Sequence, residues 1–215
     1  MRTLILFGVL ILFSVSGVAQ QNNILSAPEE SDSTKSDWQF EGVIYDYILP
    51  NETDYLSPVF YADYKSIHFE ARYNYEDKNT ASVFGGYRFE TGSELIFGAT
   101  PIAGFVFGNT DGVAPGLLID ITYKKFDFYS ESEYVFDFSE KENNFFYTWS
   151  ELAVSPFENF RTGFSASRTR LYQTDRDIQH GIFAQYSFGK LTGGLHYFNP
   201  FTDDYFLIAT MGFEF

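Results

Sequence analysis

The residues of this sequence that could do chemistry are charged side chains that recur at every second position. In the stretch HFEARYNYE, which begins at His68, the polar residues His68, Glu70 and Arg72 alternate with apolar neighbours. A period of two is typical of a β-strand with one polar and one apolar face. The same parity along the chain assigns to the polar face Asp63, His68, Glu70, Arg72, Arg88, Glu90, Asp120, Lys124, Asp127, Glu131, Glu133, Glu151 and Arg161, among which acidic groups outnumber basic ones.

Two kinds of chemistry are open to these side chains if the polar face lines the inside of a closed barrel. Carboxylates and guanidinium groups can interdigitate into a network of ion pairs that fills the interior. Alternatively, they line a narrow water-filled path whose net negative wall attracts cations and cationic or neutral solutes. Both outcomes stay open here, because they depend on which charges face each other across the barrel.

Catalytic and metal-binding chemistry has few candidate residues. The three histidines are His68, His180 and His196, and none has the spacing of a metal site such as HExxH. We expect His196 beside Phe183 as a packed side chain. We expect His180 at the outer rim as an interfacial polar residue, with contact to lipopolysaccharide phosphates as the weaker functional interpretation. Since cysteine is absent, disulfides and thiolate metal sites are excluded, and we expect no enzymatic activity, no metal and no cofactor.

The elements that must position these side chains are strands. From residue 38 onward no segment has the apolar length of a membrane helix or the periodicity of an amphipathic helix. About twelve segments show strand character: 38–47, 57–65, 67–76, 80–90, 94–107, 114–124, 126–137, 144–155, 159–171, 177–188, 190–199 and 204–215. In the third segment, Tyr75 is expected to face outward and Glu76 inward. Ten strands are the alternative, if the first segment stays outside the barrel or the glycine-rich stretch near 98–108 is irregular.

The connections between these segments alternate between short turns and mostly longer polar loops, such as GNTDGV and SEKENN. Membrane barrels of the outer membrane have short periplasmic turns and longer outside loops, so both ends of 38–215 are expected on the periplasmic side. Lipid cannot satisfy exposed backbone groups, and strands cross a membrane only as a closed barrel. The sequence therefore predicts an all-β fold, a single antiparallel up-and-down transmembrane β-barrel. The soluble alternative is a secreted β-sandwich or lipocalin-like barrel with its apolar face inside.

The last residues of the sequence, YFLIATMGFEF, continue the alternation from Tyr205 to Phe215. This stretch resembles the C-terminal strand of bacterial outer-membrane β-barrels, in which the terminal Phe and the alternating apolar residues are read by the barrel-assembly machinery. The resemblance implies a Gram-negative outer membrane as the location and Phe213 and Phe215 as the assembly signal. It also implies outer-membrane lipid, lipopolysaccharide and the assembly machinery as partners. It is a resemblance to a class and implies no specific function.

The first 37 residues differ in character from the rest. A cationic start at Arg2, a short apolar run and small residues before Gln20 are typical of a cleaved secretory signal peptide over residues 1–19. The stretch 20–37 is polar and aperiodic, which predicts a disordered periplasmic leader before the barrel domain at 38–215. The formal net charge of −15 argues against nucleic acid as a partner.

For function, the acidic polar face favours a narrow porin-like channel for small solutes. The main alternative is a closed structural or surface-interaction barrel without transport. A lipid-modifying outer-membrane enzyme is the third possibility, which requires a Ser beside a positioned His. No pattern in the sequence indicates the transported solute or the oligomeric state.

Overall fold

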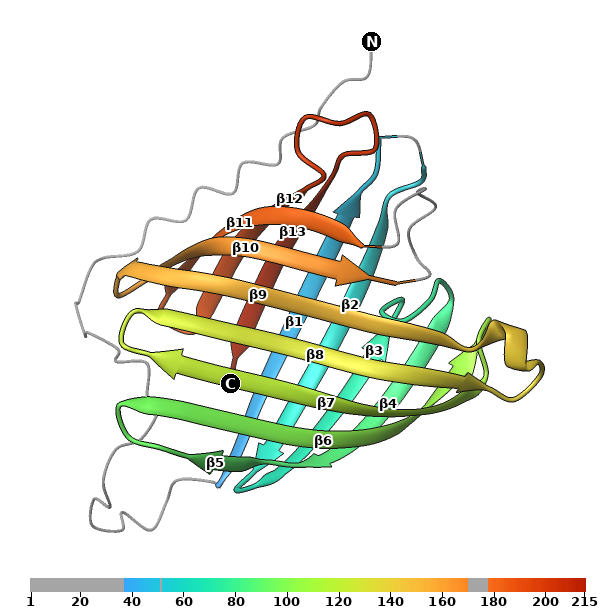
Figure 1. The fold of residues 1–215 in the computed structure, drawn as a ribbon, viewed down its shortest axis with the longest axis horizontal. Helices are drawn as coiled ribbons and strands as arrows, with labels where there is room; N and C mark the ends of the chain where they lie inside the picture. The colour runs from blue at the N-terminus through green and yellow to red at the C-terminus, as the bar shows by residue number, and fades with distance from the viewer. Residues whose placement is uncertain (1–36, 51, 170–177) are drawn as a thin grey trace. The chain divides into compact units, whose positions relative to one another are not determined.

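The structure is a computed structural model, and it describes residues 37–50, 52–169 and 178–215 (Figure 1). In chain order its elements are β1 (Trp38–Ile48), β2 (Tyr55–Tyr64), β3 (Ile67–Tyr73), β4 (Thr80–Tyr87), β5 (Phe89–Thr91), β6 (Leu95–Gly108), β7 (Gly112–Tyr123), β8 (Phe126–Asp137), η1 (Lys141–Asn143), β9 (Phe145–Phe157), β10 (Phe160–Arg168), β11 (Gln179–Phe188), β12 (Leu191–Phe198) and β13 (Phe206–Glu214). The expected signal peptide, and the expected leader up to residue 36, lie outside the described residues.

The strands form one closed antiparallel barrel (Figure 1). Neighbours in the chain pair with each other, and the pairing of β1 with β13 joins the two ends of the series. β4 and β5 are two parts of one barrel strand, because they pair with successive stretches of β6. The barrel therefore has twelve strands, and the predicted all-β up-and-down barrel is confirmed. The ten-strand alternative is wrong, since β1 pairs on both sides and the glycine-rich stretch forms part of β6.

Side chains alternate between the two faces of the barrel wall. In β3 exposed and buried residues follow one another without a break: Phe69 and Tyr73 face outward, while Glu70 and Arg72 face inward. Each strand exposes at least one large apolar side chain on the outer wall. A soluble barrel has a polar outer face and its apolar face inside, so this distribution is atypical of a soluble protein.

The strand expected at 67–76 ends earlier than its alternation suggests. Asn74 has a left-handed φ of 54°, and its side-chain amide donates to the carbonyl of Leu56 at 2.9 Å. The chain leaves the β-ladder at this point, so Tyr75 lies inside the barrel and is buried. Its predicted outward orientation is wrong, because strict alternation holds only while the backbone is extended.

The strand expected at 80–90 is interrupted at Arg88, whose backbone N–H donates to the carbonyl of Ser66 at 2.8 Å. The turn that follows depends on Gly92, which has a φ of 109°. A Cβ at this position would lie 1.9 Å from the carbonyl oxygen of Leu95. Only glycine fits such a turn.

The two ends of the barrel differ in their connections. The short-turn end has connections at 65–66, 92–94, 124–125, 158–159 and 189–190. The long-loop end has connections at 49–54, 74–79, 109–111, 138–144, 169–178 and 199–205. Within the described ranges no helix has the length and hydropathy needed to cross a membrane, and η1 is a single short turn.

Candidate functional site in the barrel lumen

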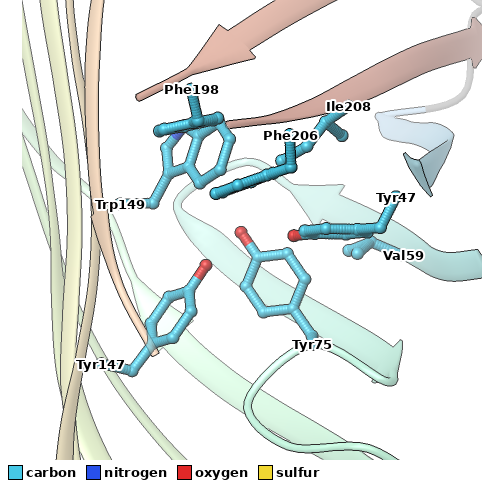
Figure 2. Close-up of a cluster of buried hydrophobic side chains, with 8 residues drawn as sticks. All are labelled: Tyr47, Val59, Tyr75, Tyr147, Trp149, Phe198, Phe206 and Ile208. Atoms are coloured by element: carbon cyan, nitrogen blue, oxygen red, sulfur yellow. The ribbon is translucent and has the colours of Figure 1, made fainter. Parts of the chain in front are cut away.

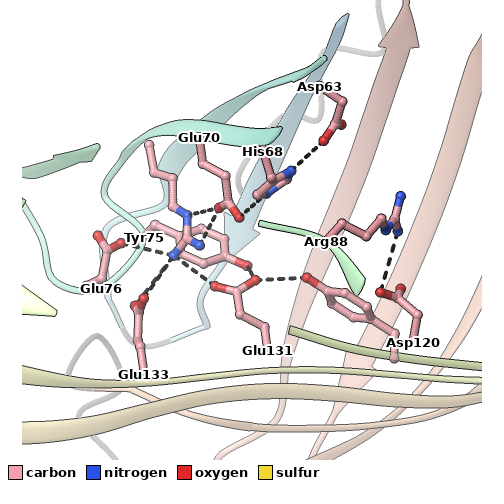
Figure 3. A network of polar contacts seen from close by, with 11 residues as sticks. Asp63, His68, Glu70, Tyr75, Glu76, Arg88, Asp120, Glu131 and Glu133 are labelled. Carbon is pink, nitrogen blue, oxygen red and sulfur yellow. Dashed lines mark hydrogen bonds and ion pairs between the residues drawn. The ribbon is translucent and has the colours of Figure 1, made fainter. Parts of the chain in front are cut away.

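One guanidinium group, that of Arg72, contacts four carboxylates in the lumen, and Figure 3 shows the network of polar contacts to which they belong. The side chain of Arg72 is fully buried, and its Nε donates to Glu70 at 2.6 Å. Its Nη1 lies 2.8 Å from Glu131, 3.2 Å from Glu76 and 3.4 Å from Glu133. We call these five residues the Arg72 cluster.

The elements explain how the Arg72 cluster assembles. Glu70 and Arg72 are two residues apart on β3 and therefore share its inner face. Glu131 and Glu133 have the same spacing on β8, on the facing part of the barrel wall. Glu76 comes from the loop after β3 and, as predicted, its side chain points inward and is buried. The cluster therefore ties β3 to β8 across the lumen.

Hydroxyl groups supply further hydrogen bonds to these carboxylates. Tyr75 and Tyr129 donate to Glu131 at 3.2 and 3.0 Å, and Ser82 donates to Glu76 at 2.6 Å. Burial raises the pKa of Tyr75, which lies in the loop after β3, well above its usual range, so its hydroxyl stays a donor. Even with these bonds, one guanidinium faces four carboxylates within 4 Å.

His68 connects the Arg72 cluster to the short-turn end. Its Nδ1 lies 2.7 Å from Asp63 and its Nε2 lies 2.6 Å from Glu70. Both ring nitrogens face a carboxylate oxygen, an arrangement that an imidazolium with two N–H donors satisfies. The Glu70 side chain is fully buried, whereas that of Asp63 is 33% exposed. Access to solvent thus begins on the short-turn side of His68.

A second ionic group surrounds Arg161 on β10. Its Nε donates to Asp127 at 2.9 Å, and its Nη1 donates to Gln185 at 3.0 Å and also to Glu151. The indole N–H of Trp149 donates to the other oxygen of Glu151 at 3.0 Å. This group, the Arg161 cluster, is less buried than the Arg72 cluster.

Aromatic and aliphatic side chains form a buried cluster in the part of the lumen toward the long loops, and Figure 2 shows this cluster from close by. The buried set, called the aromatic plug here, consists of Tyr47, Val59, Tyr75, Tyr147, Trp149, Phe198, Phe206 and Ile208. Phe198 and Phe206 stack with ring centroids 4.9 Å apart, and Trp149 meets Phe198 edge-on at 5.5 Å. Tyr45 on β1, which packs against the plug, meets Trp149 on β9 at 6.2 Å, so this packing joins opposite parts of the barrel wall.

Toward the short-turn end the inward-facing charges become exposed. Arg88 lies 3.6 Å from Asp120, and their side chains are 47% and 38% exposed. Glu90 is also exposed. Lys124, expected inside, lies in a turn with a φ of 56° and pairs with Glu94 at 3.3 Å. Its side chain is largely exposed, because the strand has ended before it.

The structure therefore divides the predicted polar set into groups. Glu70, Arg72, Glu131 and Glu133 come together in the Arg72 cluster. The Arg161 cluster brings together three more: Asp127, Glu151 and Arg161. His68 joins Asp63 to Glu70, whereas Arg88 and Asp120 form a separate exposed pair at the short-turn end. Sequence reasoning missed the roles of Tyr129 and Trp149, although each has the parity of the charged residues on its own strand.

The other two histidines have different surroundings. His196 is buried, pairs with Phe183 and stacks on its ring at 5.0 Å, as expected. His180 is exposed and pairs with Ala166. Within the described ranges no group of three or more His, Asp or Glu side chains is arranged to hold a metal ion.

The expected assembly-signal residues lie at the short-turn end of the outer wall. Phe213 and Phe215 are both exposed, and their ring centroids are 5.3 Å apart. The backbone N–H of Phe215 donates to the carbonyl of Phe40 at 3.0 Å, and its ring lies 6.3 Å from that of Phe60. These contacts link the last strand to β1 and β2.

Comparison of the sequence with protein-family models and with curated proteins finds no match. The lumen and the outer wall are therefore the features from which a function is inferred.

Proposed function

We propose that this protein is an outer-membrane β-barrel whose lumen is closed by its own side chains, a structural or surface-interaction barrel without an open pore. The apolar outer wall supports the membrane location, because such a surface is stable only in an apolar surrounding. The bacterial outer membrane is the location implied by the alternating stretch that ends at Phe215.

The single observation that carries the closed lumen is the complete burial of the Arg72 cluster. A continuous water path through the barrel would leave the side chains along it exposed to solvent. The side chains of Arg72, Glu70, Glu76 and Glu133 are 0% exposed, and that of Glu131 is 1% exposed. The aromatic plug fills the lumen next to this cluster. A solute could pass only if both groups moved.

Planar-bilayer recording on the purified, refolded full chain tests this proposal. The wild-type protein is expected to give no discrete conductance. In the double variant Trp149→Ala with Phe198→Ala the aromatic plug loses ring volume but the Arg72 cluster is intact, so this variant is also expected to give no conductance. Insertion of both proteins is checked by protease protection in vesicles. Stable single-channel steps from inserted wild-type protein would overturn the closed-lumen proposal.

A narrow cation-preferring channel is the second candidate, and two observations favour it. The inward-facing charges at the short-turn end are partly exposed, and acidic groups are in excess in the Arg72 cluster. If the wild type conducts, it should prefer potassium over chloride. Changing Glu131 and Glu133 together to Gln should then weaken that preference, because the Debye length of ~10 Å at 0.1 M salt leaves a lumenal charge only partly screened.

A further inference from the structure

The loop between β12 and β13 displays one aromatic side chain in an unusual way. Phe201 is 95% exposed, and its backbone has a φ of 64°. Residues with large side chains rarely adopt this left-handed region. Such a conformation persists only where the surrounding structure holds it, and it points to a role for the residue so displayed.

Hydrogen bonds inside the loop supply that support. Asn199, itself at a φ of 47°, is buried, and its backbone N–H donates to the carbonyl of His180 at 2.7 Å. Its side-chain amide donates to the carbonyl of Asp204 at 3.1 Å, and the hydroxyl of Thr202 donates to the carbonyl of Asn199 at 2.8 Å. These hydrogen bonds hold the loop backbone in one conformation, and they therefore fix the position from which the side chain of Phe201 extends.

The direction of the ring follows from its neighbours. Phe201 meets the ring of Tyr197 edge-on at 6.2 Å, and Tyr197 meets Tyr205 edge-on at 6.0 Å. Tyr197 lies between the inward-facing His196 and Phe198 on β12, so it belongs to the outer wall. Tyr205 is exposed next to the inward-facing start of β13. The three rings therefore continue the outer wall beyond the strands and do not cover the mouth of the barrel.

We propose that Phe201, together with Tyr197 and Tyr205, anchors the long-loop end in the lipid of the membrane surface. This inference rests on the proposed membrane location. The partner is lipid because the three rings are continuous with the apolar wall that faces the bilayer, and because aromatic rings favour the interface between water and hydrocarbon. The competing interpretation is that a protein outside the membrane binds these three rings.

The test uses the absence of cysteine from the sequence. Phe201→Cys is labelled with an environment-sensitive fluorophore, and the full chain is refolded into vesicles that contain nitroxide-labelled lipids. The expected result is quenching by nitroxides close to the headgroups and a blue-shifted emission. Two matched sites calibrate the measurement: Phe164→Cys in the middle of the outer wall and Glu142→Cys in the exposed η1 turn.

The controls separate failure of the anchor from failure of the membrane location. If the label at 164 is quenched by lipid while the label at 201 behaves like the one at 142, the anchor is overturned and the membrane barrel stands. If lipid quenches none of the three labels, the membrane location itself fails and the anchor fails with it. Quenching at 164 and at 201, without quenching at 142, supports the anchor and argues against a protein occupant.

Discussion

Replacement of Arg72 by Met tests whether the lumen is closed by a buried ionic network. Met keeps an unbranched apolar stem but is shorter, and it removes the guanidinium and its bonds to four carboxylates. Those carboxylates then lose their only cationic contact within the Arg72 cluster. Uncompensated buried charge is costly, because the low local dielectric strengthens repulsion and desolvation is not offset.

The expected magnitude follows from burial. Breaking a buried ion pair by removing one partner costs about 3–5 kcal/mol of unfolding free energy, and the side chains of Arg72 and its partners are at most 1% exposed. Arg88→Met is the matched control. Its ion pair with Asp120 is 47% and 38% exposed and 3.6 Å long, and a pair of this kind contributes about 0–1 kcal/mol.

Urea titration of the refolded protein in detergent micelles measures both variants, with the folded fraction read from the gel shift of unheated samples. We expect a clearly lower midpoint for Arg72→Met and a midpoint near wild type for Arg88→Met. Equal, small shifts for the two variants would refute the reasoning, because they would show that solvent reaches the carboxylates. Glu133→Gln tests whether removal of a negative charge from the cluster costs less stability than removal of the positive charge. Four carboxylates surround one guanidinium, so carboxylates are in excess and neutralising one of them should cost far less than loss of Arg72.

Three other predictions follow from the fold. In intact cells a membrane-impermeant maleimide should label Asn109→Cys at the long-loop end. It should label Lys190→Cys at the short-turn end only after the outer membrane is breached, and the opposite pattern would show that the short-turn end faces the outside of the cell. Phe215→Asp should lower the yield of folded protein in the membrane more than Phe215→Tyr, because it removes the ring that lies 6.3 Å from Phe60; equal yields would show that the ring is incidental. Gly104→Ala should destabilise the barrel by about 1–3 kcal/mol, since its Cβ would lie 2.4 Å from a backbone oxygen on β4; an unchanged urea midpoint would contradict this.

The barrel could be predicted from the sequence because a membrane strand needs only a period of two and a turn. Both signals are local, and they survive wherever the backbone is extended, as in β3 up to Tyr73. They fail where the chain leaves the ladder. Asn74 adopts a left-handed conformation that many residue types avoid, and nothing in the alternation indicates that Tyr75 turns inward there.

The inward-facing residues of the candidate site were also predictable, but their partners were not. The alternation of side chains along each strand places Arg72 and Glu131 on inner faces. The 2.8 Å contact between them depends on the register of every strand pair in the barrel. A strand neighbour can be inferred from chain order, since adjacent segments pair. A contact across the lumen joins residues 59 positions apart in sequence, with β4, β6 and β7 between their strands, and no local pattern encodes it.

These contacts across the lumen matter because of what an up-and-down barrel lacks. Each strand is hydrogen-bonded only to its two neighbours, so the β-ladder alone gives no direct interaction between opposite walls. The Arg72 cluster links β3 to β8, and the contact of Tyr45 with Trp149 links β1 to β9. Both links require the barrel to close in one strand register, since a slip of one residue would turn these side chains to the outer wall. The buried charges therefore act against a barrel slipped by one residue, in which they would lie on the apolar outer wall, and this accounts for a costly ionic cluster in a lumen that also holds the aromatic plug.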